Sequence, residues 1–471
     1  MKLSLGPLVI LMFLVPAFIV PAGLTPVCFA QGGNQGGGNQ GGGNQGGGGN
    51  AGGILINADG LVSMAATRTA PSSQTRRQMK SKATDQLSAE LLKSRDLRKV
   101  SLKKLNDECA RQLESSKVVG DTPEIMALAG LTRIDFVAID LEQNDVIFAG
   151  PSEAFAETDG RLLGIESGRP TLHFEHLLAA LRLPPEAAFA GCSFDPDPTR
   201  LVAARRILDA GKTPGSVQEG IGVFRRMAEE LGNWNVSVMG VREDCRTALA
   251  MVEADYVLKR LTLGVDDPPV KGFRSQLASM KPGEDILRRW WFAAAANGIE
   301  TNEDETLYRL TGPRIQLFGQ DELVDENGQR TGAAVNLKSS YEYAKHFSNR
   351  IDALAEKVSA IAELQNIFDL MVVGAIVRKA KRDGLLLDIE TLLDEQALPL
   401  NKYGVPKEVP SLGNARMQGR STLLGLVGGG VRIEPRNLIS KARRVEDPGT
   451  FAPLKEYPTS PEKTAWYWNA E

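Results

Sequence analysis

Paired acidic residues are the feature of this sequence most able to do chemistry. They occur in three stretches: FDPDP (Asp195 and Asp197), GVDDPP (Asp266 and Asp267) and NEDE (Glu303, Asp304 and Glu305). Two carboxylates brought together can act as acid and base in glycoside hydrolysis, or can bind calcium. Asp before Pro is also ordinary turn chemistry. The sequence does not place two of these groups in one cleft, so a secreted hydrolase using loop carboxylates is the alternative hypothesis.

Histidine, a frequent metal ligand and general base, occurs only three times in the chain. His173 and His176 are three residues apart on an expected helix, a spacing that can present two imidazoles to one metal ion. The sequence has no HExxH pattern, and no third ligand is evident. A weak metal site therefore belongs to the same alternative hypothesis, and we expect no cofactor.

Four other short motifs fail when their full patterns are required. The G-x-S-x-G of serine hydrolases does not occur. Ser101 and Lys104 match S-x-x-K, but the companion S-D-N and K-T-G motifs are missing. The GKT at 211–213 lacks the first glycine of a P-loop, because Arg206 occupies that position, and no helix clearly follows the glycine run at 425–430. We therefore assign no catalytic and no cofactor-binding residue.

The first thirty residues have the pattern of a secretory signal peptide. Lys2 supplies the positive charge, LVILMFLVPAFIV supplies the apolar segment, and the expected cut falls between Ala30 and Gln31. An uncleaved membrane anchor is the competing interpretation, which two prolines in the apolar run disfavour. The expected location is exported: periplasmic, at the cell surface or extracellular.

Three cysteines follow the expected cut, at Cys109, Cys192 and Cys245. Their odd number and wide spacing argue against a disulfide scaffold. One disulfide with one free thiol, and three buried thiols, are both compatible with the sequence. The CxxC pattern is absent from the sequence, so no thiolate zinc site is indicated.

The charge is unevenly distributed. The net charge of the whole chain is −3, which argues against nucleic-acid binding by bulk charge. Residues 76–117 hold twelve Lys or Arg and six Asp or Glu, a net charge of +6. The residues between these charges are helix formers and not base-stacking aromatics, which favours docking on the protein itself over binding an anionic polymer.

The order of elements predicts an α+β fold of mixed, layered strand and helix units. Expected strands such as RIDFVAID, NDVIFAG and NVSVMGV alternate with helical patterns. Because one core stops growing at about 250–300 residues, several units are expected. The expected divisions are a signal peptide (1–30), a flexible Gly/Asn/Gln-rich linker (31–53), a strand with a basic helical segment (54–117), an α/β unit (118–265), strands with a long helical hairpin (266–440) and a tail (441–471).

Two longer segments are predicted to be helical. Residues 79–116 carry an apolar face of Leu102, Leu105, Cys109 and Leu113. Residues 336–383 contain no proline and repeat apolar residues every three or four positions, which predicts a helical hairpin or a bent helix. The repeated residues are Tyr343, Phe347, Ile351, Leu354, Val358 and Ile361.

Two further patterns concern the ends of the chain. GGILINADGLVS (52–63) resembles GGVRIEPRNLIS (429–440), which predicts neighbouring strands or equivalent hairpins, with chance as the remaining explanation. The tail places Trp466, Tyr467 and Trp468 together, as a clamp on the folded body or as an exposed docking patch.

The stretch VEADYVLKRLTLGVDDPPVKGF, followed by RRWWF and LTGPRIQLF, resembles a secreted domain-of-unknown-function family (DUF1598) that is abundant in planctomycete bacteria. GRPTLHFEHLLAALR and IFDLMVVGAIV also fit that family, and the likeness covers roughly residues 130–440. The resemblance implies export and a bacterial envelope or extracellular setting. It implies no known reaction, so no catalytic residue is carried over.

We therefore expect an exported, non-catalytic envelope or extracellular protein with a binding or structural role. Its expected partner is a protein or polymer of that space, or a second copy of the chain, and not a nucleic acid. No membrane span is expected after signal cleavage, because IFDLMVVGAIV covers about half a bilayer and is interrupted by Asp369.

Overall fold

The computed structural model describes residues 54–56, 62–64, 71–184, 187, 189–210, 215–281, 284, 287–295, 298–325, 327–334, 336–418, 421–446, 448–455 and 465–469. The chain divides into Met1–Gly47 and Gly48–Glu471, and all described residues belong to the second unit. The expected cleavage site at Ala30 and Gln31, and the linker 31–53, lie outside the described residues. The structure is 41% helix and 25% strand in several sheets, which confirms the mixed α+β class.

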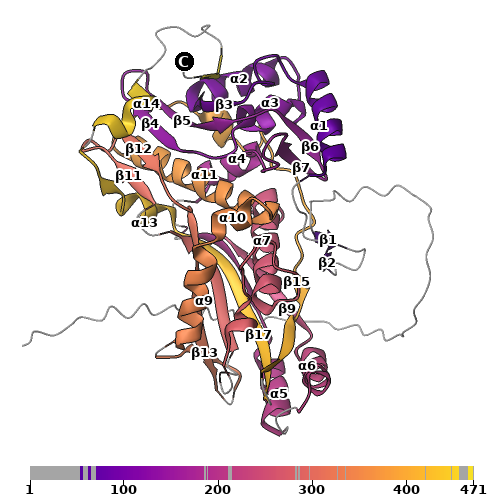
Figure 1. Ribbon diagram of the computed structural model, residues 1–471. Helices are drawn as coiled ribbons and strands as arrows, with labels where there is room; N and C mark the ends of the chain where they lie inside the picture. The colour runs from indigo at the N-terminus through magenta and orange to yellow at the C-terminus, as the bar shows by residue number, and fades with distance from the viewer. Residues whose placement is uncertain are drawn as a thin grey trace, which may run out of the picture. The chain divides into compact units, whose positions relative to one another are not determined.

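A seven-stranded sheet combines segments from both ends of the chain (Figure 1). Its order is β18-β11-β12-β4-β5-β3-β19, and all neighbouring pairs are antiparallel except β11 with β18. The bounds are β3 Arg95–Ser101, β4 Phe136–Asp140, β5 Asp145–Ser152, β11 Ile299–Thr301, β12 Leu307–Leu310, β18 Arg443–Arg444 and β19 Tyr467–Asn469.

An eight-stranded sheet forms the second layer of strands. Its order is β14-β13-β10-β17-β8-β9-β15, with β16 also paired to β17, and β10 runs parallel to β17. The bounds are β8 Ala190–Asp195, β9 Asn233–Met239, β10 Leu287–Ala294, β13 Ile315–Val324, β14 Arg330–Gly332, β15 Glu408–Pro410, β16 Gly413–Gln418 and β17 Ser421–Ile433. Each large sheet thus mixes strands from several of the units expected along the sequence.

Two buried helices, α7 and α11, belong to the same apolar core as these sheets. In α7, Arg246–Leu263, every residue except Arg260 is buried, and the helix packs on β17, β8 and β10. The helix α11, Ser359–Arg382, packs on α7, on α4 (Phe174–Leu181) and on α13 (Pro435–Ser440). One contiguous apolar cluster includes Phe148 of β5, Trp290 of β10, Met251 of α7 and Met371 of α11. Burial of this surface is the main stabilising contribution to the fold.

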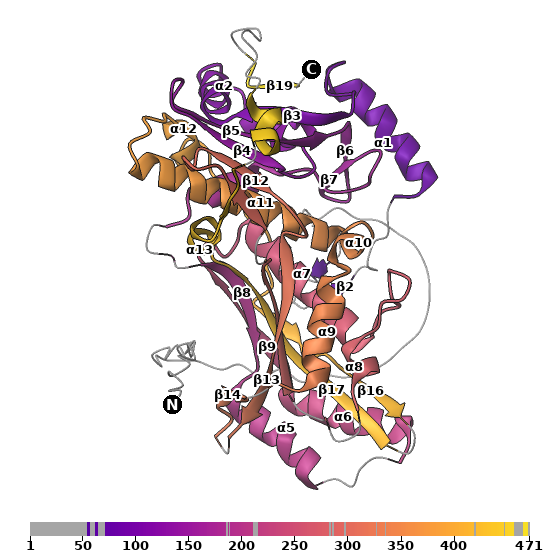
Figure 2. The ribbon, with the colours of Figure 1, turned by 60° about the vertical axis from the view of Figure 1, so that its left-hand side comes forward.

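The remaining helices lie around this core (Figure 2). They are α1 Ser73–Gln86, α2 Leu102–Glu114, α3 Pro123–Met126, α5 Pro198–Ala210, α6 Val217–Leu231, α8 Gln276–Ser279, α12 Glu390–Leu393 and α14 Ala452–Lys455. The helix α1 packs on β6 (Phe155–Thr158), which forms a two-stranded sheet with β7 (Arg161–Gly164). Ser216 caps α6 by accepting a hydrogen bond from the backbone N–H of Glu219.

The segment 336–383 is helical as predicted, but it is divided into three helices. These are α9 Lys338–Ser348, α10 Ile351–Ala355 and α11, and the predicted apolar stripe from Tyr343 to Ile361 is buried. The two long helices do not pair as a hairpin through that stripe. The helix α9 packs on β13, while α11 packs on α4 and α7.

Among the described residues, α11 is the one helix that is long and apolar enough to cross a membrane by length and composition. Its apolar window is entirely buried within the protein. Such a window is also typical of a core helix.

The prediction of a helix over residues 79–116 is partly wrong. The predicted apolar face belongs to α2, in which Leu102, Leu105 and Cys109 are buried. Residues 95–101 form β3 instead, inserted between β5 and β19. The helix-forming charged residues Arg95, Arg98 and Lys99 extend as a strand there because pairing on both sides and burial outweigh local propensity.

The prediction that the two similar end segments are neighbouring strands or equivalent hairpins is wrong. Ile54–Ile56 (β1) and Val62–Met64 (β2) pair with each other in a two-stranded sheet. Residues 429–433 instead end β17 inside the eight-stranded sheet, and Pro435–Ser440 form α13. The two segments therefore have unlike conformations, and their similarity reflects the frequency of Gly, Ile and Leu.

Candidate functional site

A cluster of buried charges surrounds the first half of α7. Glu363 of α11 accepts hydrogen bonds from three side chains: Arg161 Nε to Oε2 at 2.6 Å, Arg246 Nη2 to Oε1 at 3.0 Å, and His176 Nε2 to Oε1 at 3.2 Å. Arg161 also pairs with Glu253. The glutamate side chain is 3% exposed, so four elements, β7, α4, α7 and α11, converge on it away from water.

The pKa values of the two glutamates in this cluster are shifted in opposite directions. Burial would raise the pKa of Glu363, but Arg246, Arg161 and the hydrogen bond from His176 hold that pKa well below its ordinary value. Burial dominates at Glu253 and raises its pKa to about 7, because Arg161 is its main compensating charge. One carboxylate is therefore fixed as an anion, while the other titrates near neutral pH.

The two histidines considered as metal ligands under the alternative hypothesis are part of the same cluster. His173 is the N-cap of α4, and its Nδ1 accepts the backbone N–H of Glu175 at 3.2 Å. His176 places Nδ1 2.9 Å from the hydroxyl of Thr247. Burial lowers the pKa of both histidines, that of His173 well below its ordinary value. Within the described part of the chain, no three His, Cys, Asp or Glu side chains form a group that could hold a metal ion.

A second buried ion pair lies farther along α7. Lys259 Nζ donates to Asp255 Oδ2 at 2.8 Å, one helical turn away, and lies 3.3 Å from the centre of the Phe194 ring. Gly429 of β17 makes room for the pair, because a Cβ there would lie 2.4 Å from Asp255 Oδ1. Burial is the first cause of both pKa shifts, lowering that of Lys259 and raising that of Asp255.

The acidic residues proposed for hydrolysis do not converge. Asp195 pairs with Arg330 and, at 3.5 Å, with Arg289. Asp197 caps α5 by accepting the backbone N–H of Thr199 at 2.8 Å. These assignments leave the two aspartates of the FDPDP motif with separate structural roles.

The acids of the other two stretches also lie apart. Asp266 pairs with Arg260 at the end of α7, and Asp267 is exposed. Glu305 lies 3.1 Å from Lys379 of α11, and Glu303 and Asp304 are exposed. The structure thus does not pair an acidic residue of one stretch with an acidic residue of another.

The three thiols are buried in the fold, and the serine of the S-x-x-K motif caps a helix. Cys109, Cys192 and Cys245 are free and buried, which selects the three-thiol alternative, and burial raises the pKa of Cys109 to about 12. Ser101 is the N-cap of α2 and accepts the backbone N–H of Lys104 at 3.1 Å. The GKT motif lies outside the described residues.

The basic segment is partly used inside the protein. Arg98 is fully buried and donates to the carbonyl of Ala129 at 2.6 Å. Arg76 donates to the carbonyl of Ile165 at 3.4 Å, and Lys103 donates to that of Gln143 at 3.1 Å. These contacts agree with docking on the protein itself.

The eight-stranded sheet has one face turned away from α7 and α9. The strand registers place Trp291, Phe318, Gln320, Ser193 and Ser237 on this face, which we call the open sheet face. Trp291 and Phe318 are directly opposite each other and stack, with ring centres 6.1 Å apart and planes 16° apart. Phe318 is 39% exposed, which is unusual for a large aromatic side chain in a sheet.

The open sheet face also carries compensated charges. Arg330 joins Asp195 of β8 to Glu322 of β13, and Arg432 pairs with Glu434 at 2.5 Å. The charges of these ion pairs are thus balanced, and the face combines an aromatic pair with hydroxyl and amide groups.

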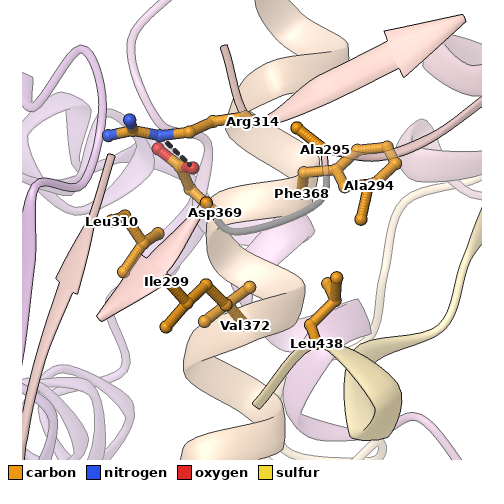
Figure 3. Close-up of a pocket in the computed structure, with 10 residues that line it drawn as sticks. Ala294, Ala295, Ile299, Leu310, Arg314, Phe368, Asp369, Val372 and Leu438 are labelled. Carbon is orange, nitrogen blue, oxygen red and sulfur yellow. Dashed lines mark hydrogen bonds and ion pairs between the residues drawn. The ribbon is translucent and has the colours of Figure 1, made fainter. Parts of the chain in front are cut away.

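A small pocket lies beside α11 (Figure 3). Asp369 and Arg314 are paired at its edge, with Nε 3.0 Å from Oδ1, and Phe368, Val372 and Leu438 are among the apolar residues that line it. Its volume is about 20 Å³, which is room for a single water molecule. The pocket is therefore a packing defect at the Arg314–Asp369 pair and does not accommodate a larger ligand.

The sequence reasoning missed the charged residues of α7. Arg246, Glu253, Asp255 and Lys259 stand in a helix whose other residues are mostly apolar, and Asp255 and Lys259 have the spacing of an ion pair on adjacent turns. Charges on several faces of an otherwise apolar helix could have indicated burial with partners from other elements.

A family model described as "Protein of unknown function (DUF1598)" matches residues 192–275. The matched segment runs from β8 through α7 and contains Asp195 and the four charged residues of α7, so it supports the resemblance to this domain-of-unknown-function family over a shorter range than expected. A search of the curated proteins and a search of the solved structures found no match.

Proposed function

We propose that this chain is an exported, non-catalytic protein that binds a polysaccharide of the cell envelope or extracellular matrix on its open sheet face. The signal-like N-terminus, the Gly/Asn/Gln-rich linker and the resemblance to a planctomycete family of secreted proteins support export. The linker would carry the folded unit away from its site of attachment or export.

The observation that carries the proposal is the stacked pair of Trp291 and Phe318. The partly exposed rings of this pair offer an apolar surface, and the C–H face of a pyranose ring is also apolar. Gln320, Ser193 and Ser237 stand on the same face and can donate to, and accept from, sugar hydroxyl groups. Balanced ion pairs on the face favour a neutral polymer over a nucleic acid.

The buried charge cluster supports the non-catalytic part of the proposal. His176 and Glu363 have the hydrogen-bonded arrangement of a base and its orienting carboxylate, but His176 is only 1% exposed. Its second nitrogen lies beside Thr247, and Glu363 neutralises two arginines. These groups thus stabilise the junction of α4, α7 and α11.

The test is retention of the purified mature chain, residues 31–471, on insoluble polysaccharides, using cellulose, chitin and the carbohydrate fraction of the native envelope. We expect saturable retention on at least one of them, reduced at least about tenfold by Trp291→Ala or Phe318→Ala, since central aromatic residues dominate binding free energies. Tyr341→Ala is the matched control, because Tyr341 is an exposed aromatic residue on α9.

Equal retention of the wild type and both variants would remove the open sheet face from the proposal. A lack of retention on every carbohydrate would reject the polysaccharide itself. Crosslinking of the tagged chain in its native envelope fraction, with mass spectrometry of the products, then decides whether the partner is a protein.

A further inference from the structure

We propose that the outer edge of β3 is a strand-docking site for the aromatic C-terminal strand, and that a second copy of the chain can supply this strand. The strand β19 is the last element of the chain, and it joins the seven-stranded sheet at that edge alone. This inference concerns self-association and does not depend on the proposed polysaccharide binding.

The backbone of the tail is held by an antiparallel ladder. Tyr467 is opposite Val100, and Asn469 is opposite Arg98. The ladder extends one residue farther, because the backbone N–H of Ser101 donates to the carbonyl of Trp466 at 3.0 Å. Strand addition of this kind supplies affinity through the main chain, while the side chains decide which strand is accepted.

The side chains around the tail form a built site. Asn469 Oδ1 accepts a hydrogen bond from Arg98 Nε at 3.0 Å, and its amide nitrogen donates to Glu90. Arg98 is fully buried and is fixed by the carbonyls of Ala129 and Glu90, at 2.6 and 3.1 Å. Arg98 and Glu90 therefore bind the oxygen and the nitrogen of the Asn469 amide. The backbone carbonyls of Ala129 and Glu90 hold Arg98 in position for this contact.

Two tryptophans, which stand on either side of Tyr467 in the sequence, anchor the tail. Trp466 and Trp468 are buried. Lys104 of α2 lies 5.7 Å from the centre of the Trp468 ring, and Arg98 lies 5.6 Å from that of Tyr467. The site thus selects an extended strand of three consecutive aromatic residues followed by Asn. In one chain this strand is the protein's own tail.

A second copy is the occupant that these contacts favour. If β19 leaves, β3 becomes an edge strand with unpaired N–H and C=O groups, which readily pair with another strand. The tail of another copy has the same residues and makes every contact described above. Because β19 is covalently attached to its own chain, its effective concentration at β3 of that chain is high. Pairing with β3 of a second copy therefore increases with protein concentration.

Chains with one added cysteine test the exchange directly. Val100→Cys and Tyr467→Cys are opposite each other in the ladder, while Cys109, Cys192 and Cys245 are buried. We mix a full-length mature chain carrying only the first change with one carrying only the second, and oxidise the mixture mildly. Exchange predicts a covalent heterodimer whose yield rises with protein concentration, at least about tenfold above the yield of a matched mixture in which the second chain also carries Trp466→Ala and Trp468→Ala.

A heterodimer yield equal to that of the matched mixture would overturn the exchange between copies. The double mutant Val100→Cys/Tyr467→Cys is the positive control, because it should close an intramolecular disulfide. Loss of that disulfide in a folded chain would reject the docking contact itself.

Peptide binding provides a second measurement, which does not require the cysteine variants to fold. A fluorescent peptide of residues 465–471 is titrated into the full-length mature chain with Asn469→Ala, which weakens only the chain's own strand. We expect anisotropy to rise to saturation at a peptide concentration at least about tenfold lower than for the same peptide with Trp468→Ala. Equal curves for the two peptides would overturn recognition of the aromatic strand.

Discussion

Arg161 of β7 and Glu363 of α11 form an ion pair of 2.6 Å, although they are 202 residues apart in the sequence. Both side chains are nearly without solvent contact, and Glu363 also binds Arg246 and His176. Two charges removed from water contribute to stability only when the partners remain in place. The pair therefore joins β7 to α11 through charges that depend on each other.

Replacing Glu363 by Gln should destabilise the protein strongly. The amide keeps the shape but removes the charge that compensates Arg161 and Arg246. Breaking a buried pair costs about 3–5 kcal/mol, which urea unfolding measures as a lower midpoint. Lys338→Ala removes the exposed Lys338–Glu342 pair and should leave the midpoint almost unchanged. A loss below about 1 kcal/mol for Glu363→Gln would contradict the assigned role of the cluster.

Glu253 should make stability fall as the pH rises. Its pKa in the folded protein is about 7, above the ordinary value of 4.5, chiefly because of burial. Between these values the folded state binds more protons than the unfolded state, so the contribution of Glu253 is complete below pH 4.5 and is lost through pH 7.

The Glu253→Gln variant isolates this effect from the histidines, whose lowered pKa values act in the opposite direction. The variant should gain about 3 kcal/mol relative to the wild type between pH 5 and pH 8 in urea titrations. A stability difference that does not change with pH would show that Glu253 remains ionised throughout.

Gly429→Ala should destabilise the eight-stranded sheet. The added Cβ would meet Asp255 Oδ1 at 2.4 Å and the backbone oxygen of Trp290 at 2.9 Å. Neither group can move freely in the core, so we expect a loss of about 1–3 kcal/mol in the free energy of unfolding. Gly222→Ala on α6 is the matched control, since nothing lies within 4 Å of its Cβ and Ala favours a helix by about 0.5–1 kcal/mol. Equal effects of the two changes would disprove the close approach at Gly429.

The three thiols should be unreactive in the native state. Cys109, Cys192 and Cys245 are buried, and burial raises the pKa of each thiol, which suppresses the reactive thiolate. Ellman's reagent should therefore label the native mature chain slowly and all three thiols in denaturant without prior reduction. Labelling of only one thiol after denaturation would indicate a disulfide.

Local patterns in the sequence were sufficient for many elements. The apolar face of α2 and the stripe from Tyr343 to Ile361 depend on neighbouring residues along the chain, and each appears in the structure as predicted. Periodicity of 3.6 residues is a property of short segments, which is why it can be read without the fold.

Contacts between distant segments depended on the tertiary structure alone. Residues 95–101 became β3 because β5 and β19 lie on either side, and Glu363 found Arg161, Arg246 and His176 on three other elements. The sequence by itself determined the α+β class and the helical and strand periodicities. Only the tertiary structure decided which charges are neutralised in the core and which aromatic pair faces outward, because burial and strand register are set by segments far apart in the chain.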